Sequence, residues 1–329
     1  MIKRIVFTFL LTFYLVSKAD TEQQAKDILM KTVHSMATLN YQGTVAFLRN
    51  GKLETMKYFH VYDHGVEQER LLSLNSPLRE IVRDADKVSC LFKATKQMVV
   101  DHRPSPRSFL LDLPKNLDGL NEAYSFEIVG QEDIAMLPAF VIKIEPKDEF
   151  RYARKIWIEQ KQYLPLKVEV YDVQNMTLEQ VVFTDIEVKD KLALVDMDRE
   201  QTLSDDTATG YVSAAPKQSP AEIAALTIGN LPIMGFREIF FTRRPLHRSD
   251  QLADHLLLSD GFASVSVYVE IKNTGVKSEQ EKFDGMQSVG AVNFFSRTIN
   301  DAQVTVLGDV PAKTVKAIAQ AVKIKQSSP

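Results

Sequence analysis

Side chains that could do chemistry are scattered along this sequence of 329 residues rather than grouped. The six histidines stand at positions 34, 60, 64, 102, 247 and 255. The closest pair, His60 and His64, straddles a predicted turn, where a metal ion would need further ligands from elsewhere. We therefore interpret both as solvated turn and strand residues, and we predict neither a metal site nor a cofactor.

Sequence motifs of the common enzyme classes are absent. The sequence contains no G-x-S-x-G, H-E-x-x-H, C-x-x-C, P-loop or G-x-G-x-x-G pattern. Serine hydrolases, zinc proteases, redox dithiols and nucleotide-binding proteins would carry these motifs. The plentiful carboxylates show no spacing that singles out an acid–base pair. The sequence therefore predicts a non-enzymatic binding protein without catalytic residues, with an exported hydrolase as a less favoured alternative.

The single cysteine, Cys90, lies in an apolar run that is typical of a strand. One thiol cannot form an internal disulfide, so the fold must be stabilised by its core. Free cysteines are commonly small buried residues. We interpret Cys90 in this way, and a reactive thiol is the alternative.

Two neighbouring predicted strands place apolar and aromatic side chains on one face of a sheet. Side chains alternate along a strand, so one face collects Val45, Phe47, Met56, Tyr58 and Tyr62. If that face is concave and open, these residues could line a pocket for an acyl chain. The alternative is that they pack against covering helices as core.

A second candidate for binding is the pair Arg243 and Arg244, at the end of a predicted strand. Adjacent side chains of an extended chain point to opposite faces. One or both guanidinium groups could donate two hydrogen bonds to a carboxylate on a partner protein. The alternative is a solvated strand end.

The spacing of apolar residues changes along the chain, and it predicts the elements that would position these candidate residues. Apolar residues at helical spacing predict an amphipathic helix over residues 22–39. From Tyr41 the period becomes two, and about ten strands separated by turn signals continue to Val188. Short connections favour antiparallel pairing. With the early helix and residues 104–122 as covers, the latter with a short helix near 115–122, this order predicts a large antiparallel open half-barrel.

A change in composition marks a second domain. Residues 201–220 are rich in Ser, Thr, Ala, Asp and Pro and lack periodicity, which is typical of a linker. We therefore assign residues 20–200 to the half-barrel and 221–325 to a smaller α+β domain. The second domain is expected to contain a hairpin at Asp260-Gly261, one strand over residues 286–297, and a helix that begins at Pro311.

The N-terminus resembles a secretory signal peptide, residues 1–19. Lys3 and Arg4 precede an apolar run, Ile5 to Val16, and cleavage is expected after Ala19. The run is shorter than the ~20 residues of a membrane-spanning helix; an uncleaved anchor is the alternative. The mature chain would carry 37 basic and 43 acidic side chains, a net charge of −6. That charge is unlike a nucleic-acid-binding protein.

Several short motifs, in order, resemble the RseB/MucB family. They are Asn40-Tyr41-Gln42-Gly43-Thr44, Glu69-Arg70-Leu71-Leu72-Ser73-Leu74, Leu164-Pro165-Leu166, Phe183-Thr184-Asp185-Ile186, Arg243-Arg244-Pro245-Leu246 and Ser259-Asp260-Gly261-Phe262. The similarity covers about residues 36–322. It implies a first domain similar to the lipoprotein carriers LolA and LolB, followed by a smaller partner-binding domain. Arg243, Arg244, Asp260 and Phe262 match family motifs and are candidate partner contacts.

The resemblance also implies a function. Members of the family are periplasmic proteins that bind the periplasmic segment of a single-pass anti-sigma factor and shield it from regulated proteolysis. Lipopolysaccharide or acyl-lipid signals release this brake on an extracytoplasmic-function sigma factor. A LolA-type lipoprotein carrier is the alternative function, although a carrier has no evident need for the second domain. The sequence leaves a homodimer as an open alternative.

Overall fold

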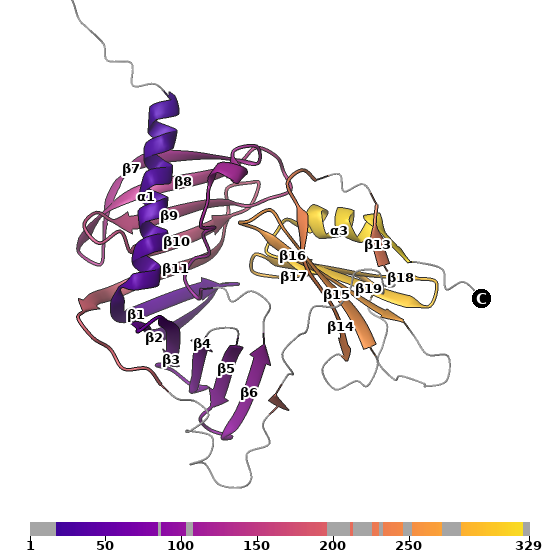
Figure 1. Ribbon diagram of the computed structural model, residues 1–329, viewed down its shortest axis with the longest axis horizontal. Helices are drawn as coiled ribbons and strands as arrows, with labels where there is room; N and C mark the ends of the chain where they lie inside the picture. The colour runs from indigo at the N-terminus through magenta and orange to yellow at the C-terminus, as the bar shows by residue number, and fades with distance from the viewer. Residues whose placement is uncertain are drawn as a thin grey trace, which may run out of the picture.

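The computed structural model describes residues 18–84, 87–102, 108–195, 211–212, 226–229, 233–245, 252–271 and 284–324. These residues form two domains that lie side by side (Figure 1). The expected signal peptide up to residue 17, and the expected linker apart from Tyr211 and Val212, lie outside the described residues. None of the helices in the described part of the chain is long and apolar enough to cross a membrane.

The first domain begins with helix α1, Lys18–Thr38, which starts four residues before the predicted position. The expected cleavage site after Ala19 therefore falls in its first turn. Ala25, Ile28 and Leu29 recur at helical spacing on one face and are almost completely buried. This face packs against the large sheet, and α1 runs across its strands in the view of Figure 1.

The large sheet has twelve strands in the order β12-β6-β5-β4-β3-β2-β1-β11-β10-β9-β8-β7. Their bounds are β1 Asn40–Arg49, β2 Lys52–Asp63, β3 Val66–Ser73, β4 Arg79–Asp84, β5 Lys87–Phe92, β6 Gln97–His102, β7 Tyr124–Ile134, β8 Leu137–Pro146, β9 Ala153–Glu159, β10 Pro165–Tyr171, β11 Thr177–Lys189 and β12 Tyr211–Val212. The first eleven strands pair antiparallel, and the end strands β7 and β12 do not pair with each other. The sheet is therefore open, as predicted. Strand β6 was not anticipated.

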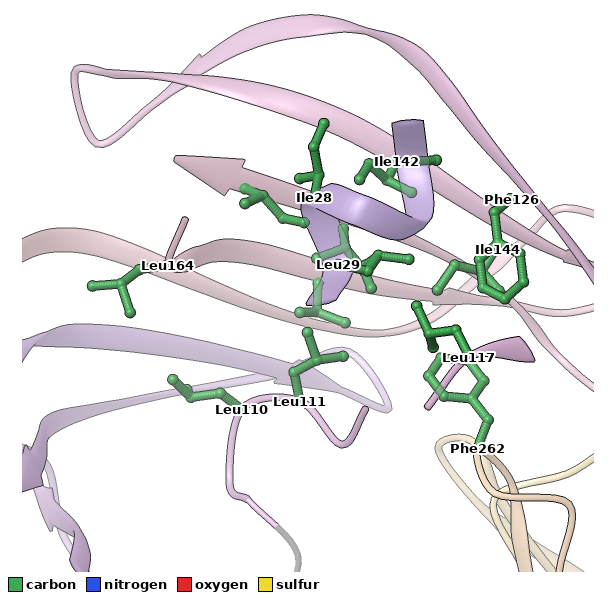
Figure 2. Close-up of a cluster of buried hydrophobic side chains, with 14 of the residues drawn as sticks. Ile28, Leu29, Leu110, Leu111, Leu117, Phe126, Ile142, Ile144, Leu164 and Phe262 are labelled. Carbon is green, nitrogen blue, oxygen red and sulfur yellow. The ribbon is translucent and has the colours of Figure 1, made fainter. Parts of the chain in front are cut away.

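Residues 108–123, here called the cover segment, lie on the concave face together with α1. Leu110, Leu111, Leu117 and Leu120 of this segment are buried in the main core, where α1 also packs (Figure 2). The helix predicted over residues 115–122 is only the short 3-10 helix η1, Asp118–Leu120. The segment is therefore held by its leucines rather than by regular helical hydrogen bonds.

The end of the first domain, just before the linker, is held against the large sheet. The Gln68 side chain donates to the carbonyl oxygen of Val195 and accepts from its backbone N–H, each at 2.9 Å. Val195 packs on a small cluster formed by Val82, Met98 and Val100. Further along, β12 pairs in parallel with β6. The chain is thus attached to the large sheet both just before the linker, at Val195, and within it, at Tyr211 and Val212.

The second domain is a six-stranded antiparallel sheet covered by one helix. The sheet order is β14-β15-β16-β19-β18-β17. The bounds are β14 Arg237–Pro245, β15 Leu252–Ser259, β16 Ser264–Ile271, β17 Gly285–Val289, β18 Val292–Ile299, β19 Ala302–Gly308 and α3 Ala312–Ala321, with the small pair β13 Leu226–Ile228 and β20 Val322–Ile324. Helix α3 begins directly after Pro311, as predicted. The α+β fold class is confirmed.

The prediction of one strand over residues 286–297 is wrong. The chain reverses at Gly290-Ala291, and β17 pairs antiparallel with β18 on either side of this turn. Gly290 has a φ of +61°, a left-handed conformation that residues with a Cβ seldom adopt. Apolar residues on both sides of the glycine conceal the turn in the sequence pattern.

Candidate functional site

The five residues predicted to line an acyl pocket lie on two paired strands, β1 and β2, of the large sheet. Val45, Met56 and Tyr58 are almost completely buried in the main core, and Phe47 packs against it. Tyr62, which is 39 % exposed, lies at the rim. In this structure the four inner residues pack as core. An acyl chain on this face would therefore have to displace a covering element.

A buried ionic cluster adjoins these residues on β2, β3 and β4. Glu69, which is 1 % exposed, accepts hydrogen bonds from the Tyr58 hydroxyl at 2.9 Å and from Arg83 Nε at 2.9 Å. Glu69 also accepts from the Ser108 hydroxyl at 2.5 Å and from the backbone N–H of Phe109 at 2.8 Å. One carboxylate thus fixes the start of the cover segment to the sheet.

Charges around Glu69 compensate one another. Burial and the nearby Glu69 carboxylate raise the pKa of Tyr58 well above its usual value, so its hydroxyl stays a donor. Burial alone would lower the pKa of the Arg83 guanidinium, but Glu69 and Glu67 raise it instead. Arg83 also donates to Glu67. The cluster therefore keeps one cation between two carboxylates.

His60 extends this cluster toward α1. Its Nδ1 lies 2.7 Å from the carbonyl oxygen of Leu39 and must donate to it, because a carbonyl only accepts. Its ring stacks on Tyr41 with centroids 4.9 Å apart. Nε2 lies 3.6 Å from Glu67 Oε1. His60 is therefore a buried member of the cluster, and our interpretation of it as a solvated residue is wrong. His64, by contrast, is exposed in the turn.

The candidate partner contacts Asp260 and Phe262 lie between the domains, in the turn between β15 and β16. Asp260 Oδ1 accepts from the backbone N–H groups of Phe262 and Ala263 at 2.9 and 2.7 Å, which shapes the turn. Its other oxygen, Oδ2, accepts from Arg151 Nε at 2.5 Å and the Tyr124 hydroxyl at 3.0 Å, both in the first domain. Asp260 is thus buried within this protein.

Arg151 is the centre of this contact and is 1 % exposed. It donates to Asp260, Asp148 and the carbonyl oxygen of Met234, so that it joins residues of both domains. Burial opposes its charge, but Asp260 and the neighbouring Tyr124 raise the pKa of the guanidinium. The charge is therefore retained, and the contact is a hydrogen-bonded buried ion pair. Removing one partner of such a pair leaves the other charge uncompensated.

Phe262 reaches from the second domain into the main core of the first. It is buried in the same cluster as Leu117 and Leu120 of the cover segment, and Figure 2 shows its ring near Leu117. It meets Tyr124 edge to face at 5.5 Å, and the Arg154 guanidinium lies 4.4 Å over its ring. Both domains therefore share one continuous apolar core at this point.

Smaller contacts extend the domain interface to two further places. Asn293 donates to the Tyr152 hydroxyl at 2.8 Å, and Arg154 pairs with Asp309 at 3.0 Å. The backbone N–H of Gly290 donates to Asn50 at 2.8 Å. The domains are thus held in one arrangement by ionic, polar and apolar contacts together.

The remaining candidates lie elsewhere. Arg243 donates two hydrogen bonds to Asp254, at 2.5 and 2.9 Å, within the second domain. The side chain of Arg244 lies outside what the structure describes. Cys90 is half-buried in β5, and burial raises the pKa of its thiol. Among the described residues, no group of three or more His, Cys, Asp or Glu side chains could hold a metal ion.

Sequence patterns gave no signal for Glu69 or Arg151 as central residues. Both are charged residues inside otherwise ordinary strand or turn segments, and their partners are far away in the chain. The turn signal at Asp260-Gly261 was visible, but it did not reveal which domain the turn contacts.

Comparison with known proteins matches both domains to one family. The MucB/RseB N-terminal domain matches residues 24–203, and the MucB/RseB C-terminal domain matches residues 222–323. The sigma-E factor regulatory protein RseB of Salmonella typhimurium is 25 % identical over 326 residues, which cover 95 % of each chain. The sigma factor AlgU regulatory protein MucB of Pseudomonas aeruginosa is 25 % identical over 305 residues, covering 91 % of this chain and 90 % of MucB.

Solved structures support the same fold. MucB in complex with MucA(peri) superimposes with a TM-score of 0.67 at 23 % identity, over 92 % of this chain and all of that chain. Because the matched regions together span most of the chain in the expected order, the chain belongs to the MucB/RseB family.

Proposed function

We propose that this chain is an exported, non-enzymatic regulator that binds the periplasmic segment of a single-pass anti-sigma factor. By covering that segment it shields the anti-sigma factor from regulated proteolysis, and so restrains an extracytoplasmic-function sigma factor. The observation that carries this proposal is the presence of both family domains, in order, in one chain. Relatives that match this chain over at least nine tenths of its length are named as regulatory proteins of sigma-E and of AlgU, and MucB forms a complex with MucA(peri).

The proposed location is the periplasm, after cleavage behind Ala19. The basic start and the short apolar run at residues 3–16 support export. The proposed partner surface is on the second domain, near the end of β14 at Arg243 and Arg244. Asp260 and Phe262 would act differently, because they are buried between the domains. Their role would be to fix the position of the partner-binding domain.

Release by a lipid or lipopolysaccharide signal is part of the proposal, and the contacts suggest a physical route for it. The cover segment fills the concave face with Leu110 and Leu111, while Leu117 and Leu120 share a core cluster with Phe262. Gly261 lies so close to this segment that a Cβ there would stand 3.6 Å from Leu120 Cδ2. A ligand that displaced the cover segment would therefore remove packing from the domain interface. Such a ligand would favour a different domain arrangement.

The test is a titration of the mature chain, residues 20–329, with the periplasmic segment of the anti-sigma factor from the same organism. We expect saturable binding that weakens when lipopolysaccharide is added, together with slower cleavage of the bound segment. Phe262→Ala should reduce the loss of partner affinity that lipopolysaccharide causes. The control Leu53→Ala should reduce it less, because Leu53 is exposed whereas Phe262 is buried between the two domains.

One result would contradict the proposal. An absence of binding under all conditions would remove the regulatory role. Co-purification of a stoichiometric acylated protein would then favour the LolA-type carrier. Sedimentation of the free chain in the same buffers would show whether a homodimer forms.

A further inference from the structure

Two hairpin turns, one from each domain, meet at the edge of the domain interface. The first is Asn50-Gly51, which closes the hairpin of β1 and β2 with only two residues, because Arg49 pairs directly with Lys52. The second is the turn at Gly290 between β17 and β18. The Gly290 N–H donates to Asn50 Oδ1 at 2.8 Å. We call this meeting of the two turns the tip contact.

The first of these turns has a chemical reactivity of its own. Asn50-Gly51 is the only Asn-Gly pair in the sequence. Both residues are exposed, and their φ angles of +51° and +70° are the left-handed values that such a two-residue hairpin turn demands. A Cβ built on Gly51 would meet nothing within 4 Å. No side chain therefore crowds the peptide that follows Asn50.

An asparagine that precedes glycine can lose its amide nitrogen without an enzyme. The Gly51 backbone nitrogen gives up its proton to hydroxide and attacks Asn50 Cγ, which forms a new C–N bond. The side-chain nitrogen takes up a proton and leaves as ammonia, so that a cyclic imide remains. Water then opens the imide at either carbonyl and leaves an aspartate or an isoaspartate. Water is the only reactant consumed, and no oxidant or reductant is needed.

The tip contact opposes the first step of this reaction. Ring closure requires the Asn50 side chain to turn toward the next peptide, whereas the hydrogen bond from Gly290 holds its oxygen toward the second domain. The second turn is itself anchored, because the Ala291 N–H donates to Glu179 at 2.9 Å and Glu179 pairs with Arg49 at 2.8 Å. Asn50 is therefore restrained only while the domains are docked.

We propose that Asn50 is a deamidation site that is protected while the domains are docked and reacts when the tip contact opens. The modification then hinders reclosure. An aspartate adds a negative charge close to Glu179, which repels it. An isoaspartate adds a methylene group to the backbone of a turn that is closed by two residues. The proposal is independent of the proposed function, since it requires only the two domains and water.

The experiment follows the mature chain, residues 20–329, by peptide mass spectrometry during incubation at mildly alkaline pH. Hydroxide promotes the first step under these conditions. The change from amide to acid at Asn50 gives the rate of modification, and the urea-unfolded chain gives the unprotected rate. We expect the folded parent to react at least tenfold more slowly than the unfolded chain, because only its open form reacts.

Two substitutions should open the tip contact in different ways. Gly290→Ala places a Cβ that would overlap Glu179 Oε1, so it separates the turns directly. Phe262→Ala removes the ring that joins the cores of the two domains, so it acts from a distance. Both should raise the rate at Asn50 severalfold toward that of the unfolded chain, because the rate follows the population of the open form.

The matched control is Leu29→Ala. Leu29 is also buried in the main core, but it lies on α1, within the first domain. Its truncation removes a comparable apolar contact without touching the domain interface. The rate at Asn50 should therefore stay near that of the parent.

Three results would overturn the proposal. The first is an Asn50 that stays unmodified in both Gly290→Ala and Phe262→Ala while the unfolded chain reacts. The second is a folded parent that reacts as fast as the unfolded chain, since docking would then protect nothing. The third is an equal acceleration in Leu29→Ala and Phe262→Ala, because general unfolding would then control the reaction.

The same measurement separates this inference from the regulatory role. If lipopolysaccharide leaves the rate unchanged while both interface substitutions raise it, Asn50 stands as the site and domain opening by the lipid fails. If the anti-sigma segment does not bind at all, the rates of the parent and the variants still decide whether docking protects Asn50.

Discussion

The concave face of the large sheet has two halves that are equally buried but held together differently. The half under α1 is aliphatic: Ile142, Ile144 and Ile156 of the sheet are buried there in one cluster with Leu29 of the helix. The half on β2, β3 and β4 contains the ionic cluster around Glu69 and Arg83. In the first half stability follows the apolar area removed from water. In the second half it depends on each charge keeping its partner.

The cover segment joins the two halves. Its first residues, Ser108 and Phe109, are hydrogen-bonded to Glu69, while its leucines lie in the aliphatic core. The cover segment is therefore held by directional hydrogen bonds at its first residues and by non-directional apolar packing along the rest. The two kinds of contact should respond to different substitutions.

The largest loss of stability is expected for Glu69→Leu, in the ionic half. It leaves the buried Arg83 with only Glu67 and frees the start of the cover segment. We expect the free energy of unfolding, measured by urea denaturation, to fall by about 3–5 kcal/mol. Glu54→Leu is the control, because its ion pair with Arg79 is partly exposed to solvent and should contribute at most about 1 kcal/mol. Equal effects of the two substitutions would contradict the distinction between the halves.

In the aliphatic half, Leu29→Ala should cost about 2–4 kcal/mol in the same measurement. Leu29 is fully buried on α1, so its loss removes apolar contact and leaves a cavity. Met30→Ala, at the partly exposed neighbouring position, should change stability by much less. Equal free energies of unfolding for Leu29→Ala and Met30→Ala would show that the half under α1 is not a packed core.

A smaller effect is expected for Tyr58→Phe, which removes one hydroxyl from the border between the halves. Glu69 would lose one of its donors while keeping Arg83, Ser108 and Phe109. We expect a loss of about 1–2 kcal/mol, typical of a buried hydrogen bond to a charged group. Because Tyr58→Phe keeps the ring that packs in the core and removes only the hydroxyl, a loss as large as that of Glu69→Leu would contradict this prediction.

The smallest predicted effect is a pH dependence of the ionic half alone. The neighbouring His60 side chain and Arg83 lower the pKa of Glu67 to about 2, against the effect of its partial burial. A carboxyl whose pKa is lowered on folding contributes stability above its ordinary pKa, near 4.5, and loses it as the pH falls toward 2. Urea denaturation between pH 2 and 6 should show Glu67→Gln less stable than the parent at pH 6 and nearly equal at pH 2. A constant difference across that range would rule out this linkage.

The architecture of the molecule was largely visible in the sequence because local signals carry it. The turn pair Asp260-Gly261, and Pro311 before α3, mark element ends through backbone preferences of single residues. Strand β6 and the reversal at Gly290 were missed, since a short strand and a turn inside an apolar run leave weak periodic signals.

The candidate site was predicted less well, because its contacts are long-range. The strand faces of Val45, Met56 and Tyr58 followed from alternation, but not whether α1 and the cover segment would fill the space above them. Asp260 and Arg151 are 109 residues apart in the chain, and no local pattern relates them. The assignment of Asp260 to a partner surface reflects this limit, since a charged turn residue is equally suited to pair within its own chain.

The attachment of the linker to the large sheet sets how far the two domains can travel when their interface opens. If β12 stays paired with β6, only residues 213–225 connect Val212 to the start of β13 at Leu226. At roughly 3.5 Å per residue this stretch reaches at most about 50 Å. The separated domains would therefore remain at a high effective concentration, in the millimolar range typical of short tethers. Re-docking would be a fast intramolecular event, so the open form would persist only while a ligand or partner occupies it.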